Sequence, residues 1–127
     1  MKKIDIHLHP YFDDDNMNNY VACMDKAGVV AGLVHGIQEE LSPPKNKKAR
    51  TRKNYNELVR AACAQHKGKL YGSVCLDFNR PVRETISEIK DFASCGFISV
   101  KLFPNYGYNP ADRKYDRIWE TVEKLGL

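Results

Sequence analysis

The chain has 127 residues, which is enough for one domain with a hydrophobic core. Apolar residues make up 43% and charged residues 28%, a composition typical of globular proteins and not of disordered or fibrous ones. No apolar run reaches the roughly 18 residues that a membrane span needs. The N-terminus shows no apolar segment of the kind found in secretion signals. We therefore expect a cytoplasmic protein that does not cross a membrane.

The net charge of +4 comes from one short segment. The remainder of the chain carries a net charge of −2. Proteins that bind nucleic acid usually spread positive charge over a whole face. We interpret this segment as a solvated or anion-facing loop and do not expect a nucleic acid as partner. Its six positive side chains are Lys45, Lys47, Lys48, Arg50, Arg52 and Lys53.

The four cysteines are Cys23, Cys63, Cys75 and Cys95. None of them forms a C-x-x-C pair, so the spacing argues against a zinc ribbon or a disulfide framework. Each lies within an apolar pattern. We therefore expect buried, reduced thiols, as in a cytoplasmic protein.

Residues 4–10 are expected to form an extended strand that begins the fold. Side chains two residues apart on a strand point the same way. Ile4, Ile6 and Leu8 therefore share one face, which can be buried against a hydrophobic layer.

The opposite face of this strand carries Asp5, His7 and His9. Pro10 ends the strand because proline has no N–H for a strand ladder. Two neutral imidazoles held this close suit a divalent transition metal such as Zn²⁺. The alternative is that both histidines are simply polar residues at a strand end.

The rest of the chain alternates between apolar strand-like runs and helical periodicity. This alternation predicts an α/β fold with a parallel sheet and right-handed crossover helices. No linker or change in composition divides the chain, so we expect one domain. The expected strands are 29–34, 70–76 and 97–103, and the expected helices are 17–27, 54–66, 81–95 and 112–125.

Ligands of such sheets bind at the carboxyl ends of the strands. The expected strand ends carry His35, Asp77 and Lys101 as well as the two histidines of the first strand. We interpret His35 as a structural strand-end residue and Asp77 as a turn or cap residue. Tyr106 and Tyr108, in the loop after the fourth strand, either line a pocket or cover the end of the sheet.

Lys101 occupies the polar side of the fourth expected strand, in phase with Ser99. A lysine on the inner side of a sheet is costly unless it is paired or modified. Three interpretations stay open: a carbamylated metal ligand, an anion-binding residue, or a lysine whose amine reaches the surface.

The segment Ile-Asp-Ile-His-Leu-His-Pro at residues 4–10 resembles the first-strand motif of the amidohydrolase superfamily of metal-dependent (β/α)₈ barrels. Residues 72–127 resemble its amidohydrolase-related branch, which includes decarboxylases that act on aromatic acids. The fourth-strand sequence at 96–104 and the helix containing 115–119 carry this second resemblance.

The resemblance implies that His7 and His9 are metal ligands, with Zn²⁺ as the expected ion and Mn²⁺ or another transition metal as alternatives. Lys101 matches a position that in some branches is a carbamylated lysine, and we select it as the catalytic candidate. Many relatives have a histidine where this chain has Phe103. The implied chemistry on a small-molecule substrate is hydrolysis by metal-activated water, or metal-assisted decarboxylation.

The resemblance also implies further ligands on a fifth, a sixth and an eighth strand, which would lie beyond Leu127. Because a complete barrel needs about 250 residues, we expect residues 1–127 to form a single (β/α)₄ domain, the N-terminal half of a TIM barrel. Such a truncated hydrolase would be weakly active or inactive alone and would be an enzyme only when completed. The other alternative is a non-catalytic half-barrel that forms a homodimer through its open sheet edges.

Overall fold

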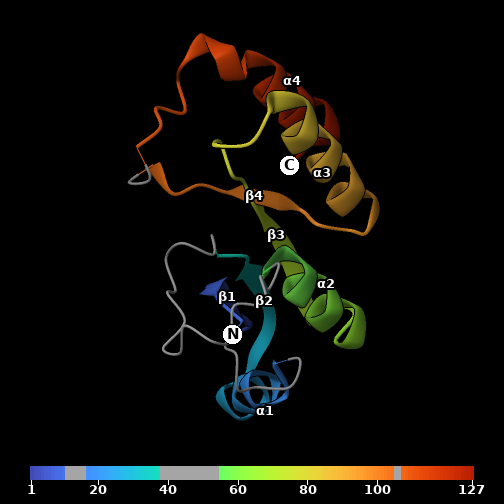
Figure 1. The fold of residues 1–127 in the computed structure, drawn as a ribbon. Helices are drawn as coiled ribbons and strands as arrows, with labels where there is room; N and C mark the ends of the chain where they lie inside the picture. Colours follow the sequence, from blue (N-terminus) through green and yellow to red (C-terminus); the bar gives the residue numbers. More distant parts are fainter. Residues whose placement is uncertain (11–16, 38–54, 105–106) are drawn as a thin grey trace, which may run out of the picture.

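The computed structural model describes residues 1–10, 17–37, 55–104 and 107–127. Within these ranges, four strands form one parallel sheet in the order β1-β2-β3-β4, and helices connect them (Figure 1). This confirms the predicted parallel (β/α)₄ arrangement. No helix in the described ranges is long and apolar enough to cross a bilayer. The elements are β1 (Lys3–Leu8), α1 (Asn18–Ala27), β2 (Val29–His35), α2 (Tyr55–Gln65), β3 (Leu70–Cys75), α3 (Val82–Ser94), β4 (Ser99–Lys101), a 3₁₀ turn η4 (Arg113–Tyr115) and α4 (Asp116–Leu125).

α1, α2 and α3 begin and end within one residue of the predicted limits, whereas the last helix, expected from 112, begins as the 3₁₀ turn η4 and becomes α-helical only at Asp116. Proline and glycine set several of these limits. Pro81 directly precedes α3, as expected for a residue that has no N–H to leave unsatisfied. Gly28 ends α1 with φ at 70°, a left-handed conformation that glycine adopts without strain. The Asp112 side chain accepts a hydrogen bond from the Lys114 N–H at the start of η4.

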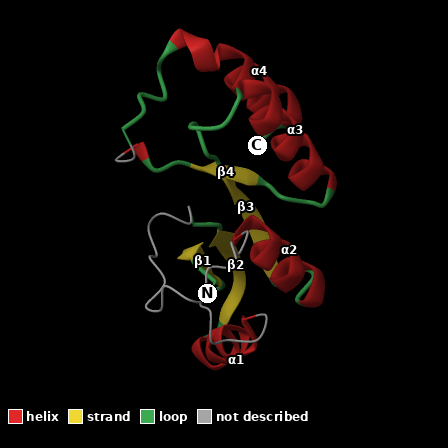
Figure 2. Ribbon diagram, in the orientation of Figure 1, coloured by secondary structure: helices red, strands yellow, loops and turns green. Residues whose placement is uncertain are grey.

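The core lies between the sheet and the helices (Figure 2). Its most deeply buried side chains come from both layers, so each helix buries the apolar stripe that its periodicity indicates. α3 and α4 also pack against each other. The core includes Val34 and Val74 from the strands, and Val59, Ile89, Phe92 and Ile118 from the helices.

The apolar face predicted for the first strand is not buried as a whole. Leu8 is 6% exposed, but Ile4 is 64% and Ile6 is 72% exposed. The prediction is therefore wrong for Ile4 and Ile6. The physical reason is that β1 is an edge strand, whose described pairing is with β2 alone.

The fourth strand is shorter than predicted. Its ladder covers only Ser99–Lys101, although we expected 97–103. Phe97 is instead buried against Gly72, where an added Cβ would lie 2.7 Å from its ring. At the other end, the Phe103 N–H donates a hydrogen bond to the Tyr108 hydroxyl at 2.8 Å. The flanking aromatic residues are therefore held by core and side-chain contacts rather than by the ladder.

The prediction of four buried thiols is wrong for two of them. Cys75 is buried and Cys63 is half-buried, but Cys23 and Cys95 are exposed. Cys95 immediately follows the end of α3, and Cys23 lies on the solvent side of α1. All four are free cysteines. Burial raises the pKa of the Cys63 thiol to about 11.

Candidate metal centre

Three histidines meet where β1 and β2 end. His7 lies near the end of β1, His9 follows it, and His35 is the last residue of β2. The ring centroids are 4.9 Å apart for His7 and His9, 5.1 Å for His7 and His35, and 5.7 Å for His9 and His35. The parallel sheet therefore gathers three of the chain's four histidines at one rim.

The two histidines of the first strand point a nitrogen at each other. The distance from His7 Nε2 to His9 Nε2 is 3.0 Å. The other ring nitrogen of His9, Nδ1, lies 3.1 Å from the His35 carbonyl oxygen. Because a carbonyl oxygen only accepts, His9 Nδ1 carries the proton. In the neutral ring, His9 Nε2 then presents a lone pair toward His7.

Burial favours the neutral form of the His9 and His35 rings. It lowers the pKa of His9, and the nearby His7, His35 and Lys101 act in the same direction, while the hydrogen bond to the His35 carbonyl opposes them. Burial also lowers the pKa of His35, with the hydrogen bond to the Ile6 carbonyl opposing it. A neutral imidazole is the form that binds a metal ion.

The geometry of His7 and His9 fits one shared divalent ion. Two imidazole nitrogens bound about 2.0–2.1 Å from the same ion lie roughly 3–3.4 Å apart, which is close to the 3.0 Å observed. The bond from His9 to a backbone carbonyl is the outer contact that metal-binding histidines commonly make. However, in the described part of the chain, no three His, Cys, Asp or Glu side chains are placed so that they could hold one metal ion together. The spacing of the two histidines is thus that of two ligands of one ion.

Lys101 lies at the same rim, on the strand next to β3. It pairs in register with Cys75 and is half-buried. Its Nζ lies 5.3 Å from the centroid of the Phe103 ring, a cation–π contact. Its charge contributes to the lowered pKa values of His9 and His35. The rim thus combines the His9 and His35 rings, whose neutral form burial favours, with the amine of Lys101.

The other predicted rim residues have structural roles or lie outside the described residues. Asp77 accepts a hydrogen bond from the Asn79 N–H at 2.9 Å, as expected for a turn residue. Tyr108 is buried and stacks on Phe78 with a centroid distance of 4.5 Å, so it covers the core rather than lining a pocket. Tyr106 and the basic segment 45–53 lie outside the described residues.

His35 is the residue whose role the sequence did not reveal. It is 8% exposed, and its Nε2 donates a hydrogen bond to the Ile6 carbonyl oxygen at 2.9 Å. Its Nδ1 is buried and has no hydrogen-bond partner among the described residues. The strand-end position was visible in the sequence, but the contact with β1 depends on the pairing of two strands and could not be derived from spacing.

Comparison with solved structures shows the fold of a half-barrel. The chain matches a 5-carboxyvanillate decarboxylase from Novosphingobium aromaticivorans with bound manganese and a nitrobenzoic acid ligand (TM-score 0.74, 14% identity, 97% of this chain and 48% of that chain). It matches a 2,6-dihydroxybenzoate decarboxylase from Rhizobium (TM-score 0.69, 14% identity, 98% and 47%). It also matches a probable 2-pyrone-4,6-dicarboxylic acid hydrolase from Acinetobacter baumannii with bound citric acid (TM-score 0.65, 14% identity, 98% and 47%). The chain spans about half the length of each.

Comparison with curated proteins found no significant match. The amidohydrolase family model, in contrast, matches residues 4–127, nearly the whole chain. The structure is accordingly a (β/α)₄ part of a TIM barrel, as the sequence predicts. The chain belongs to the amidohydrolase family.

Proposed function

We propose that His7 and His9 bind a divalent transition metal, Zn²⁺ or Mn²⁺, in a metal-dependent hydrolase of the amidohydrolase-related type. The observation that carries this proposal is the 3.0 Å distance between their Nε2 atoms, with the His9 lone pair directed into the gap by the bond to the His35 carbonyl. Manganese bound to one structural neighbour supports a divalent ion of this kind.

In this proposal, each residue at the rim has a separate task. A bound divalent metal supplies an activated water or polarises a carbonyl group. His9 is held in one tautomer by the His35 carbonyl. Lys101, as the catalytic candidate, binds the negative charge of the substrate at the rim and holds it beside the two imidazoles.

The proposed substrate is a small carboxylic acid. The amine of Lys101, whose charge acts on the pKa values of His9 and His35, favours an anion. Two of the neighbours hold citric acid and a substituted benzoic acid. Decarboxylation of such an acid is the alternative to hydrolysis. Measuring carbon dioxide release and ring or ester opening on a panel of aromatic carboxylic acids and their lactones separates the two reactions.

We also propose that residues 1–127 form a single (β/α)₄ domain that corresponds to the N-terminal half of the barrel. In the described residues, His7 and His9 lack a third metal ligand. The 127-residue chain alone should therefore bind metal weakly and turn over little substrate. Robust metal-dependent turnover by the isolated monomer would contradict this.

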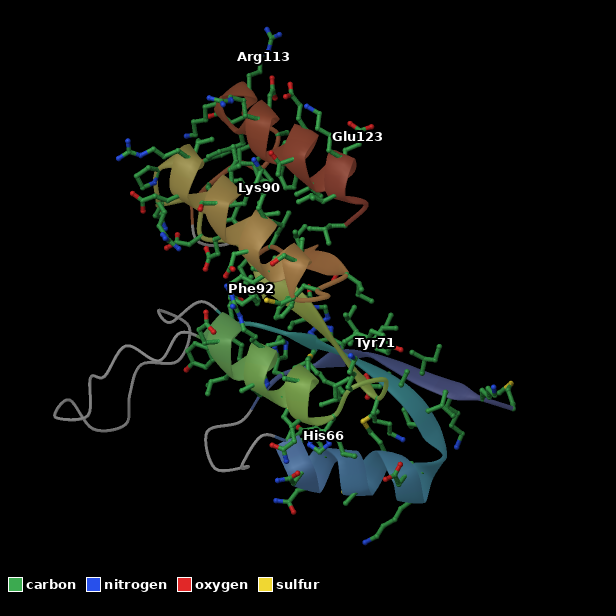
Figure 3. All side chains as sticks on the ribbon, turned by 90° about the vertical axis from the view of Figure 1, so that its right-hand side faces the viewer. His66, Tyr71, Lys90, Phe92, Arg113 and Glu123 are labelled. Atoms are coloured by element: carbon green, nitrogen blue, oxygen red, sulfur yellow. The ribbon has the colours of Figure 1, made fainter. Side chains whose placement is uncertain are left out.

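Metal binding is tested by calorimetric titration of the chain with Zn²⁺ and with Mn²⁺. His7→Ala and His9→Ala should each abolish the binding that the native chain shows. His66→Ala is the matched control, because His66 follows α2 and lies beside α1 (Figure 3), at the end of the sheet opposite the rim. Equal loss in all three variants would contradict the proposed ligands.

A second candidate function is a non-catalytic half-barrel that assembles with a second copy of the chain. It is favoured by large apolar side chains that are exposed at both edges of the sheet: Ile4 and Ile6 of β1, and Ile98, which is 50% exposed directly before β4. Size-exclusion chromatography with light scattering should then show a dimer, and Ile6→Lys should convert it to a monomer. A monomer at all concentrations would exclude this candidate.

We place the protein in the cytoplasm. The four free cysteines support this location, because two of them are exposed and would be oxidised readily outside a reducing compartment. Localisation of a tagged chain in cells tests it directly.

A further inference from the structure

β1 contains a bulge between Asp5 and Leu8, at the first histidine of the pair. Asp5 pairs with Gly32, and Leu8 pairs with Val34. Three steps along β1 therefore oppose two steps along β2, so one extra residue is inserted at Ile6 and His7. Such bulges occur next to active sites, where they redirect a side chain.

Two side chains stabilise the backbone of this bulge. The Ile6 carbonyl oxygen accepts a hydrogen bond from His35 Nε2 at 2.9 Å. The His7 N–H donates to Asp5 Oδ1 at 3.0 Å. Ile6 is thus hydrogen-bonded to the end of β2, and His7 is hydrogen-bonded to Asp5 of its own strand.

His35 contacts the β1 end a second time through its main chain. Its carbonyl oxygen accepts the hydrogen bond from His9 Nδ1 at 3.1 Å. One residue therefore holds the backbone immediately before His7 and fixes which nitrogen of His9 is free. Among the described residues, His35 Nδ1 takes no part in these bonds and has no hydrogen-bond partner.

We propose that His35 is a positioning residue of the metal centre: it holds the β1 bulge through Nε2 and the His9 tautomer through its carbonyl, so that the two Nε2 atoms converge. This inference rests on the proposed function, because it concerns the same two histidines. It goes beyond that function by assigning a task to a third histidine that the metal does not require as a ligand.

Two substitutions separate this role from simple packing. His35→Leu fills the buried position but removes the Nε2 donor to Ile6. His35→Gln keeps an N–H donor at a similar reach, so it should restore what leucine loses. Ser73→Ala is the matched control, because Ser73 pairs with His35 in register and its buried hydroxyl has no hydrogen-bond partner among the described residues.

The first measurement uses the 127-residue chain without metal. Nitrogen-detected NMR of the histidine rings should show His9 protonated on Nδ1 in the native chain, in Ser73→Ala and in His35→Gln. His35→Leu keeps the backbone carbonyl of residue 35 but loses the bond that ties β1 to it through Ile6, so His9 should lose its fixed distance to this carbonyl and exchange between both tautomers. An unchanged His9 tautomer in His35→Leu would overturn the proposal.

The second measurement is the affinity for Mn²⁺, followed by electron paramagnetic resonance. His35→Leu should weaken binding roughly 10–100-fold, the usual effect of losing an outer partner of a metal site, and His35→Gln should recover most of it. Native affinity in His35→Leu would overturn the inference. If the native chain binds neither Mn²⁺ nor Zn²⁺, the metal proposal fails, and the NMR result alone decides the role of His35.

If His35→Leu does not fold, Asp5→Ala provides the same test from the other bond of the bulge. It removes the acceptor of the His7 N–H and should weaken Mn²⁺ binding in the same direction. Native affinity in Asp5→Ala would then overturn the proposal.

Discussion

Two side chains, one from a strand and one from a helix, bind backbone groups of strands in this sheet, and they do so very differently. At the rim of β1, His35 binds the Ile6 carbonyl through one ring nitrogen. Deeper in the fold, where β2 ends beside β3, Asn56 of α2 binds the backbone of Cys75. Its Nδ2 donates to the Cys75 carbonyl at 3.0 Å, and its Oδ1 accepts from the Cys75 N–H at 2.8 Å.

The difference separates a structural replacement from a functional one. Asn56 is 6% exposed and uses both its donor and its acceptor. His35 is equally buried but leaves Nδ1 without a hydrogen-bond partner among the described residues. Buried polar groups that serve stability are normally satisfied, as those of Asn56 are. We therefore expect substitutions at Asn56 to change stability and substitutions near His35 to change mainly metal binding.

The largest effect should come from Asn56→Ala. It removes two buried hydrogen bonds to Cys75, each worth about 1–3 kcal/mol when a buried group loses its partner, so the free energy of unfolding should fall by about 2–4 kcal/mol. Urea denaturation measures this. Glu57→Ala, at the exposed neighbouring position of α2, is the control and should change stability by less than about 0.5 kcal/mol. Equal effects would show that the Asn56 bonds contribute little.

Gly36→Ala tests whether the bonds between Asn56 and Cys75 depend on the close approach of residue 36 to both side chains. A Cβ on Gly36 would lie 2.2 Å from Asn56 Oδ1 and 3.1 Å from Cys75 Cβ. We expect a loss of about 1–3 kcal/mol, typical of overpacking. In the double variant Gly36→Ala with Asn56→Ala, the clash with Asn56 Oδ1 disappears. Gly36→Ala should then lower the free energy of unfolding clearly less than it does in the native chain. Additive losses in this double-mutant cycle would contradict the contact.

Glu88→Gln probes the polar surroundings of Asn56 through pH. Glu88 accepts hydrogen bonds from Asn56 Nδ2 and Arg80 Nη1. Burial raises the pKa of Glu88 despite the attraction of Arg80. A carboxyl group with a raised folded-state pKa contributes stability below its unfolded value, and this contribution is lost as pH rises through the folded value.

Glutamine does not ionise, so Glu88→Gln does not lose this contribution to stability as pH rises. The free energy of unfolding of Glu88→Gln relative to the native chain should therefore increase as pH rises from below about 4.3, the ordinary glutamate value, through the raised pKa. Glu84→Gln, on the same helix and more exposed beside Arg80, is the control for the loss of one negative charge. Parallel pH profiles for the native chain and Glu88→Gln would contradict the raised pKa.

The smallest effect on stability should come from Asp5→Ala at the rim. Its bond to the His7 N–H is exposed to solvent, so removing it should cost less than about 1 kcal/mol. Thermal denaturation measures this loss beside that of Asn56→Ala. A loss as large as the Asn56→Ala value would mean that the bond at the rim bulge stabilises the fold as much as the two buried bonds between Asn56 and Cys75 do.

Local signals in the sequence accounted for most of the fold. Helical periodicity and punctuation by Gly28 and Pro81 located the helices, and strict alternation of elements predicted the parallel sheet. The burial of the apolar side chains on the edge strand β1 was predicted wrongly. Exposure of Ile4 and Ile6 depends on what lies beside β1, which alternation along a strand does not contain.

The candidate site was predicted in part. His7 and His9 were identified because their spacing on a strand is itself the chemical signal. The bulge before them, and the contacts of His35 and Asn56, arise from the register between elements far apart in the sequence. Asn56 was invisible for a simple reason: a buried asparagine on a helix has no periodic signature that distinguishes it from a surface residue.

The side chain of Asn56 also has a consequence for how this fold evolves. Both the N–H and the carbonyl of Cys75 are bonded to this one side chain near the start of α2. A mutation at position 56 therefore alters both bonds at once, so we expect the end of β3 and the start of α2 to change together in evolution.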